Sequence, residues 1–261
     1  MLRSLLFLFA AVLLVAPLAA HAEDGARLNV VGESFELSAN GRVLKAPDLV
    51  GAEFEIEDGG QLTTIRIDGI ITDPARPTLE LLEISLRDGD TGAWRPFCDA
   101  DAKGRRAGFP VAGRWNSEGR YVKDADQFFL TCTSGAQGKC VIFGYDPWSQ
   151  GEHGEDLAPY YEACVHMVRG DYTGRGVPFT RNGTLIDMWD DAGVQASDST
   201  MDPAFRFEAG WAPTGAVCVA RTRYENLLPT RVLVESRPDL GGQCDEAEAR
   251  RRGALIFNRS K

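Results

Sequence analysis

Aspartates around a tryptophan are the residues of this sequence whose types and spacing could do chemistry. Asp187, Asp190 and Asp191 surround Trp189. Asp171 lies upstream in a glycine-rich segment. If the tryptophan segment is a strand, alternation places Asp190 on one face and both Asp187 and Asp191 on the other. A sugar-hydrolysing carboxylate pair could be drawn from Asp171, Asp187 and Asp190. A calcium site could be built from the oxygen ligands of Asp187, Asp190 and Asp191.

A structural role is the simpler interpretation of these aspartates, and we favour it. Aspartates at strand ends commonly accept backbone N–H groups in turns, which would leave Trp189 in the core. Asp171 follows a predicted helix end, where an aspartate commonly accepts hydrogen bonds from the next turn. We therefore expect no catalytic residue and no cofactor, and we keep the hydrolytic pair and calcium as alternatives.

Other catalytic and metal-binding patterns are missing from the sequence. It contains no G-x-S-x-G, no H-E-x-x-H and no glycine-rich phosphate loop between a strand and a helix. Cys164 and His166 are two residues apart on a predicted helix, so they do not face each other as a Cys–His pair must. Zinc is not expected, because there is no C-x-x-C pair and only His153 and His166 follow the N-terminal segment.

The even number of cysteines indicates a set of disulfide bonds. In an exported chain such a set usually forms bridges, although many pairings are possible. The six are Cys98, Cys132, Cys140, Cys164, Cys218 and Cys244. Closeness in sequence favours Cys132–Cys140, around a hairpin-like connection at residues 133–139, and also Cys218–Cys244. Cys98–Cys164 is then left by elimination.

The N-terminal residues have the pattern of a signal peptide. Arg3 supplies a positive charge, residues 5–15 are apolar, and residues 20–22 form a small-x-small cleavage pattern. The apolar run is too short for a permanent span, which needs about 20 residues. No cysteine follows the run, which disfavours a lipid anchor. We expect residues 1–22 to be removed and the mature protein to begin at Glu23, without membrane insertion, in the periplasm or outside the cell.

The charge of the chain excludes some partners. The sequence has 28 Lys and Arg against 38 Asp and Glu, a net charge of −10, and loss of Arg3 with the signal peptide makes it −11. Nucleic acids and anionic membrane surfaces need their phosphates neutralised by basic residues, so neither is an expected partner. The sequence indicates no particular partner.

The first part of the mature chain is predicted to be a small antiparallel β unit at residues 23–92. Asn40-Gly41 suits a tight hairpin turn between short apolar strands. Residues 52–57 alternate strictly between apolar and acidic side chains, as a half-buried strand does. Residues 65–67 and 82–86 repeat the alternation.

Residues 93–261 are predicted to form a second domain with short strands at 128–130 and 141–143. One amphipathic helix stands out, with an apolar stripe from Leu157 to Val168, Asp156 as its cap and Gly170 as its end. Its predicted wet face carries Glu162, His166 and Arg169. Asp245 and Glu248 form a capping box for a short C-terminal helix that Gly253 ends. The fold class is therefore mainly β (α+β): antiparallel strands, one central amphipathic helix and a short C-terminal helix, stapled by disulfides.

The segment at residues 163–176, ACVHMVRGDYTGRG, resembles the signature of the ADYC domain. Blocks at 143–148, 182–187, 207–211 and 215–218 follow the order of that family, and the resemblance covers roughly residues 94–224. Two departures matter. The family's Ala-Asp-Tyr-Cys reads Gly-Asp-Tyr-Thr at residues 170–173, and Arg175 stands where an aspartate is frequent. A catalytic role for the signature cysteine therefore cannot apply to this chain.

The resemblance implies an exported bacterial protein of a family without an established function. Together with the residues, it leads us to expect a non-catalytic structural or binding module of the envelope or the extracellular space. The alternative is a secreted hydrolase of carbohydrate or cell-wall material that uses a carboxylate pair.

Overall fold

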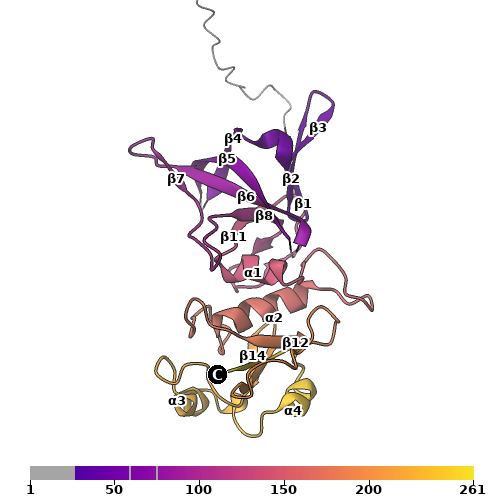
Figure 1. Ribbon diagram of the computed structural model, residues 1–261, viewed down its shortest axis with the longest axis vertical. Helices are drawn as coiled ribbons and strands as arrows, with labels where there is room; N and C mark the ends of the chain where they lie inside the picture. The colour runs from indigo at the N-terminus through magenta and orange to yellow at the C-terminus, as the bar shows by residue number, and fades with distance from the viewer. Residues whose placement is uncertain (1–26, 59, 75) are drawn as a thin grey trace, which may run out of the picture.

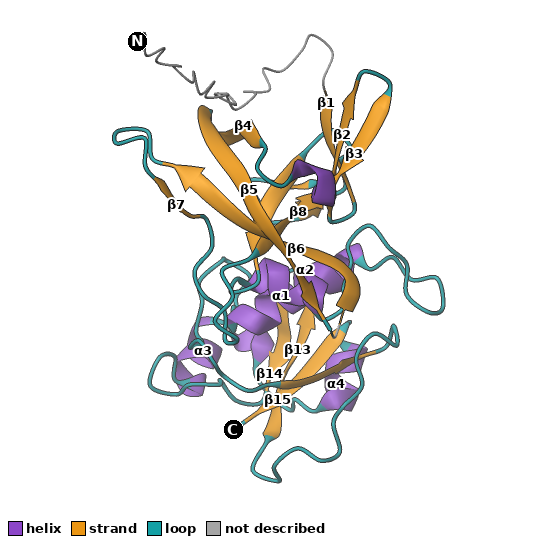
Figure 2. Ribbon diagram, turned by 45° about the horizontal axis from the view of Figure 1, so that its top comes forward, coloured by secondary structure: helices purple, strands orange, loops and turns teal. Residues whose placement is uncertain are grey.

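The computed structural model describes residues 27–58, 60–74 and 76–261, so the predicted signal peptide lies outside the described residues. The N-terminal strands lie at one end of the long axis, and the C-terminal sheet lies at the other end with helices α3 and α4 (Figure 1). Helices α1 and α2 lie between the two sheet regions (Figure 2). The predicted fold class, β-rich α+β with antiparallel strands and disulfides, is confirmed.

The N-terminal hairpins follow the predicted turn and alternation. A three-stranded antiparallel sheet consists of β1 (Arg27–Val31), β2 (Ser34–Ala39) and β3 (Arg42–Lys45). Asn40 and Gly41 both have positive φ, at 53° and 73°, as the tight turn requires. A short 3₁₀ helix, η1 (Ala46–Leu49), leads to the next sheet.

The second sheet has six strands and contributes to a hydrophobic core that it shares with the N-terminal strands. Its order is β11-β8-β6-β5-β4, with β7 pairing with β6. The strands are β4 (Glu53–Asp58), β5 (Gln61–Asp73), β6 (Arg76–Arg87), β7 (Trp94–Pro96), β8 (Gly108–Ala112) and β11 (Phe128–Cys132). On β4, Phe54 and Ile56 pack against the buried core that includes Phe35 and Ile65. The glutamates that alternate with them, Glu53, Glu55 and Glu57, are exposed, as the alternation predicts.

The predicted domain division between residues 92 and 93 stays a prediction. Strands β7, β8 and β11 all follow residue 92, yet they belong to the same sheet as β4, β5 and β6. The hydrogen-bonded sheet therefore extends across that point of the sequence. A small hairpin, β9 (Arg114–Trp115) with β10 (Tyr121–Val122), is inserted between β8 and β11.

Helices α1 (Ala136–Ile142) and α2 (Ala158–Arg169) separate the two sheet regions. The predicted strand at residues 141–143 is wrong, since Val141 and Ile142 belong to α1. A short apolar run does not distinguish a buried strand from a buried helix. Helix α2 ends at Gly170 in the left-handed conformation, as predicted. Its N-cap residue is Leu157 instead of the predicted Asp156, although Asp156 does accept the Ala158 backbone N–H at 3.0 Å.

The predicted wet face of α2 is also wrong. Glu162 and His166 are 3 % and 6 % exposed. Helix α2 contacts α1 and also strands β13, β14 and β15, so it is enclosed by other elements instead of lying on the surface. Both polar side chains are hydrogen-bonded, as burial requires: Glu162 to β10 and Arg120, and His166 to two segments described below.

The C-terminal sheet has the antiparallel order β12-β15-β13-β14. Its strands are β12 (Asp187–Asp190), β13 (Arg206–Ala212), β14 (Gly215–Val219) and β15 (Ile256–Ser260). Helix α3 (Thr230–Ser236), the 3₁₀ turn η2 (Pro238–Leu240) and helix α4 (Glu246–Arg251) connect β14 to β15. The predicted cap is present, because Asp245 Oδ1 accepts the Glu248 N–H at 2.8 Å. In the part of the chain described, no helix combines the length and apolarity needed to cross a membrane.

Three disulfides link these elements, and they correct two predicted pairings. The bonds are Cys98–Cys132, Cys140–Cys164 and Cys218–Cys244. The predicted Cys132–Cys140 and Cys98–Cys164 are wrong. Residues 136–142 form a helix instead of part of a hairpin, so Cys132 at the end of β11 and Cys140 within α1 pair with different elements. Cys140 is buried against α2, where Cys164 lies in the apolar stripe.

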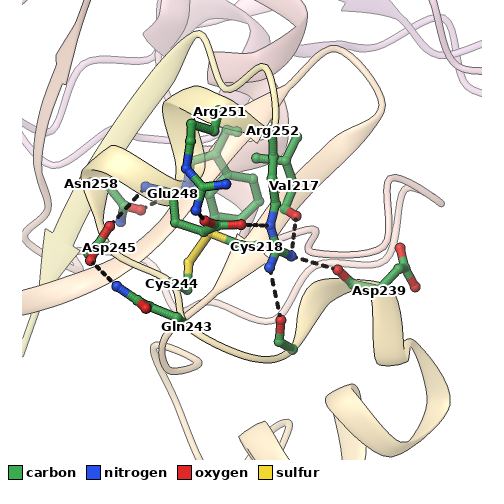
Figure 3. The surroundings of a disulfide bond; sticks show 12 residues. Val217, Cys218, Asp239, Gln243, Cys244, Asp245, Glu248, Arg251, Arg252 and Asn258 are labelled. Carbon is green, nitrogen blue, oxygen red and sulfur yellow. Dashed lines mark hydrogen bonds and ion pairs between the residues drawn. A yellow bond between two sulfur atoms is a disulfide. The ribbon is translucent and has the colours of Figure 1, made fainter.

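The predicted Cys218–Cys244 bond is confirmed. It joins β14 to the segment that enters α4, with Arg252 beside it (Figure 3). Arg252 donates to Glu248 Oε1 at 2.6 Å and to the Asp239 carbonyl at 2.8 Å. The disulfide and this arginine together hold α4 and η2 against the C-terminal sheet.

Candidate functional site

A groove of about 710 Å³ lies beside the segment that carries the family-like signature. One part of its wall is the β9–β10 hairpin at residues 115–119, and another is the start of α1 at residues 135–137. The remainder comes from Val165, His166 and Arg169 of α2 and from residues 171–176, which we call the signature turn. Segments far apart in sequence therefore enclose this space.

The hairpin wall is fixed to α2 by a buried carboxylate. Glu162 accepts the Tyr121 backbone N–H at 2.6 Å and the Arg120 Nε–H at 2.8 Å. Burial raises the pKa of Glu162 above its usual value, in spite of these bonds and of the positive charge of Arg120. The contact positions residues 115–119 opposite the signature turn.

The signature turn is built around Asp171, which is fully buried. Its Oδ2 accepts the Gly176 N–H at 2.6 Å, and its Oδ1 accepts the Arg175 N–H at 3.1 Å. Gly174 has a φ of 69°, and a Cβ there would collide with the Thr214 carbonyl oxygen. The turn thus requires glycine at residue 174 and an acceptor at residue 171, which is the structural role expected for Asp171.

The imidazole of His166 lies between two acceptors. Its Nδ1 is 3.0 Å from Asp171 Oδ2, and its Nε2 is 3.1 Å from the Pro213 carbonyl oxygen. A carboxylate and a carbonyl can only accept, so both ring nitrogens donate if both bonds form, and the ring is then an imidazolium. Neither nitrogen is left to act as a general base.

The environment of Asp171 favours its ionised form. Burial acts to raise the pKa of this carboxyl, but the hydrogen bonds from His166 and Gly176 and the charge of His166 outweigh it, so the pKa lies below its usual value. A general acid in a hydrolase needs the opposite shift, towards a higher pKa. Asp171 therefore suits a structural anion better than a proton donor.

A second buried network follows Asp171. The Tyr172 hydroxyl donates to Glu208 Oε1 at 3.0 Å and accepts the Arg223 backbone N–H at 2.7 Å. Arg223 pairs with Glu208 at 2.9 Å and also donates to the Met167 carbonyl at 2.8 Å, at the C-terminal end of α2. Burial raises the pKa of Tyr172, and the negative charge of Glu208 adds to this effect. The network joins α2, the signature turn and β13.

The aspartates of β12 do not join Asp171. Asp187 accepts from Arg259 Nε at 2.6 Å and from the Asp198 N–H at 3.0 Å. Asp190 accepts the backbone N–H groups of Ala192, Val194 and Gln195 and the hydroxyl of Tyr145. The exposed Asp191 pairs with Arg250. Neither Asp187 nor Asp190 lines the groove that contains Asp171.

Asp187 and Asp190 are also separated from each other, because they lie on opposite faces of β12. Met188 packs in the large core with Tyr145, whereas Trp189 packs with Phe257 in a different cluster. Alternation along the strand therefore sends Asp190 and Asp187 to opposite faces, as predicted. Within the described ranges, no group of three or more His, Cys, Asp or Glu side chains could hold a metal ion.

The groove contains two residues that sequence reasoning did not identify as site residues, Arg169 and Arg175. The helical pattern places Arg169 on the predicted wet face of α2, and in the sequence Arg175 is only a departure from the family pattern. Their common position depends on the turn after Gly170, which brings residue 175 back beside the last turn of α2. Helical periodicity ends at residue 170, so it does not predict that residue 175 returns to the last turn of α2.

The chain belongs to the ADYC domain family, whose match covers residues 46–225. The match begins in η1 and includes the six-stranded sheet, α1, α2 and the first three strands of the C-terminal sheet, which is more than the signature blocks covered. No match was found among curated proteins or among solved structures.

Proposed function

We propose that this protein is an exported, non-catalytic binding module of the bacterial envelope or its surroundings, and that the groove beside the signature turn is its ligand site. The observation that carries the proposal is the contrast within the groove. Its buried carboxylate, Asp171, is fully engaged in hydrogen bonds, whereas Arg175 belongs to the same turn and is an exposed side chain.

Export is supported by the signal-like N-terminal pattern and by the cysteines. All six cysteines form disulfides, and such bonds persist in oxidising compartments. Mass spectrometry of the protein from its native host tests export. We expect the mature chain to begin at Glu23. A chain that retains residues 1–22 would contradict export by signal-peptide cleavage.

The hydrolase alternative has less support. A carboxylate pair must converge on one cleft with separations of roughly 5–10 Å, one residue being held protonated. Asp187 and Asp190 instead accept hydrogen bonds on opposite faces of β12, and Asp171 lies in a different environment. Their acceptor positions are occupied by backbone N–H groups and by arginine, as in structural aspartates.

The binding proposal is tested by amide NMR titration of the mature, disulfide-bonded protein. The probes are N-acetylglucosamine, trialanine and inorganic phosphate, each taken to millimolar concentration at constant ionic strength. We expect at least one to give saturable shifts confined to residues 115–119 and 165–176. Hydrolysis of N-acetylglucosamine polymers is measured in parallel, and turnover that Asp171→Asn abolishes would support the hydrolase instead. No saturable response in the groove would contradict the binding proposal.

A further inference from the structure

We infer that the groove takes a small anionic ligand, whose carboxylate or phosphate oxygens are bound by Arg169 and Arg175. This inference rests on the proposed function, because it names the chemical class of ligand for the same groove. It starts from the two arginines that line the groove at the end of α2 and in the signature turn.

Arg169 and Arg175 line the same groove, and within the described residues neither of them is paired with a carboxylate. Arg169 Nη2 donates to the Gly176 carbonyl, which brings the end of α2 against the segment that carries Arg175. Among the ion pairs of the described residues, none involves Arg169 or Arg175. Elsewhere, Arg223, Arg250 and Arg259 all pair with carboxylates.

The local charge of the groove is opposite in sign to that of the protein. The whole chain has a net charge of −10. Among the lining residues, Asp171 faces His166 and is compensated by its hydrogen bonds, which leaves Glu118 as the acidic side chain opposed to Arg169 and Arg175. Two guanidinium groups against one carboxylate give the groove a positive potential that attracts an anion.

The chemistry of arginine sets the class of ligand. A guanidinium group presents paired donors that match the two oxygens of a carboxylate or phosphate. Trp115 lines the same groove, and its indole Nε1–H is buried without a hydrogen-bond partner among the residues that the structure describes. A volume of about 710 Å³ lies within the usual range of small-molecule sites. Long polyanions are disfavoured, because the net negative charge of the protein repels them.

The test compares probes of different charge by amide NMR titration at constant ionic strength. Inorganic phosphate and acetate are the anionic probes, which separate a tetrahedral from a planar oxyanion, and glucose is the neutral probe. We expect saturable shifts at residues 165–176 with at least one anion and none with glucose. Arg175 is exposed, so Arg175→Gln should fold normally and weaken anion binding by about tenfold or more, as expected for the loss of a charge-assisted bond.

Matched variants make the outcome specific. Arg175→Lys should bind with intermediate affinity, because it keeps the charge but loses the paired donors. Glu118→Gln should tighten anion binding by removing the opposing carboxylate. Arg42→Gln removes an exposed arginine from β3, outside the groove, and should change nothing.

Three results would overturn the inference: no saturable anion binding in the groove, equal affinities for Arg175→Gln and wild type, or an equal loss for Arg42→Gln. If glucose or N-acetylglucosamine gives saturable shifts at the groove while both anions do not, the anionic ligand class fails and the proposed binding function stands. If no probe of either charge binds there, both fail.

Discussion

Nδ1 of His166 lies 3.0 Å from Oδ2 of Asp171, which follows it by five residues and stands beyond the end of α2. The opposite ring nitrogen of His166 lies 3.1 Å from the carbonyl oxygen of Pro213, between β13 and β14. One imidazole therefore connects the helix, the signature turn and the C-terminal sheet. The turn carries the segment that resembles the family signature, and it forms one wall of the groove.

The first prediction concerns the protonation of His166. Because both of its neighbours are acceptors, both ring nitrogens must carry hydrogen for both bonds to form. Nitrogen-15 NMR of the histidine side chains, with His166→Gln for assignment, should show two protonated nitrogens for this ring. A shift typical of an unprotonated nitrogen would contradict it. Exposed His153 serves as the internal reference.

The second prediction concerns the stability of the signature turn. Asp171→Asn keeps the shape of the side chain but weakens bonds to His166, Arg175 and Gly176, so it should cost about 1–3 kcal/mol of the free energy of unfolding. Asp171→Ala should cost at least as much. Urea unfolding curves give the values, with and without millimolar calcium. Asp191→Asn, at an exposed ion pair, is the control and should have a small effect. An unchanged or higher midpoint for Asp171→Asn would reject the structural role.

The third prediction is the pH dependence of that difference. The pKa of Asp171 is lower in the folded protein than the value of about 3.9 expected in the unfolded chain. Its contribution to stability is therefore fully present above about pH 3.9 and is lost as the pH falls through the folded-state pKa. The gap in unfolding free energy between wild type and Asp171→Asn should narrow below that pH. Glu162, whose pKa is raised, is present in both proteins, so its contribution to the pH dependence cancels in the difference between their unfolding free energies. A gap that stays constant or widens on acidification would refute the assignment.

The fourth prediction concerns the disulfides. Peptide mapping without reduction should recover a bond between Cys98 and Cys132 and another between Cys140 and Cys164. The Cys140–Cys164 bond closes a separation of 24 residues, so replacing both cysteines by alanine should cost about 3 kcal/mol on the chain-entropy account. Chemical denaturation measures the loss. A peptide linking Cys132 to Cys140 would contradict the pairing.

The fifth prediction concerns the buried ion pair of Arg223 and Glu208, which are 1 % and 0 % exposed. Arg223→Met leaves the Glu208 carboxylate without its partner, and such a change typically costs about 3–5 kcal/mol. Removing both charges, as Arg223→Met with Glu208→Leu, should be less harmful than the single change, because no unpaired charge remains. Thermal unfolding of both variants provides the comparison. A single variant as stable as wild type would show that the pair contributes nothing.

The sequence by itself determined the features that depend on neighbours along the chain. The alternation of β4, the hairpin turn at Asn40 and the capping of α4 by Asp245 are local, so their periodicity and turn chemistry were sufficient. The extent of α2 and the two faces of β12 follow from the same periodicities.

Tertiary structure decided what depends on elements meeting in space. Residues 141–143 were assigned to a strand because a short apolar run fits either structure, and only the packing of α1 against α2 makes this segment a helix. The Cys132–Cys140 pairing was wrong because closeness in sequence does not give closeness of Cα atoms once a helix intervenes, and Cys98–Cys164, which depended on it by elimination, was wrong as a result. His166 is buried because α2 is enclosed by other elements, and Arg175 lines the same groove as Arg169 because the chain reverses at Gly170. Burial and convergence of side chains arise from the packing of distant segments, which local periodicity does not encode.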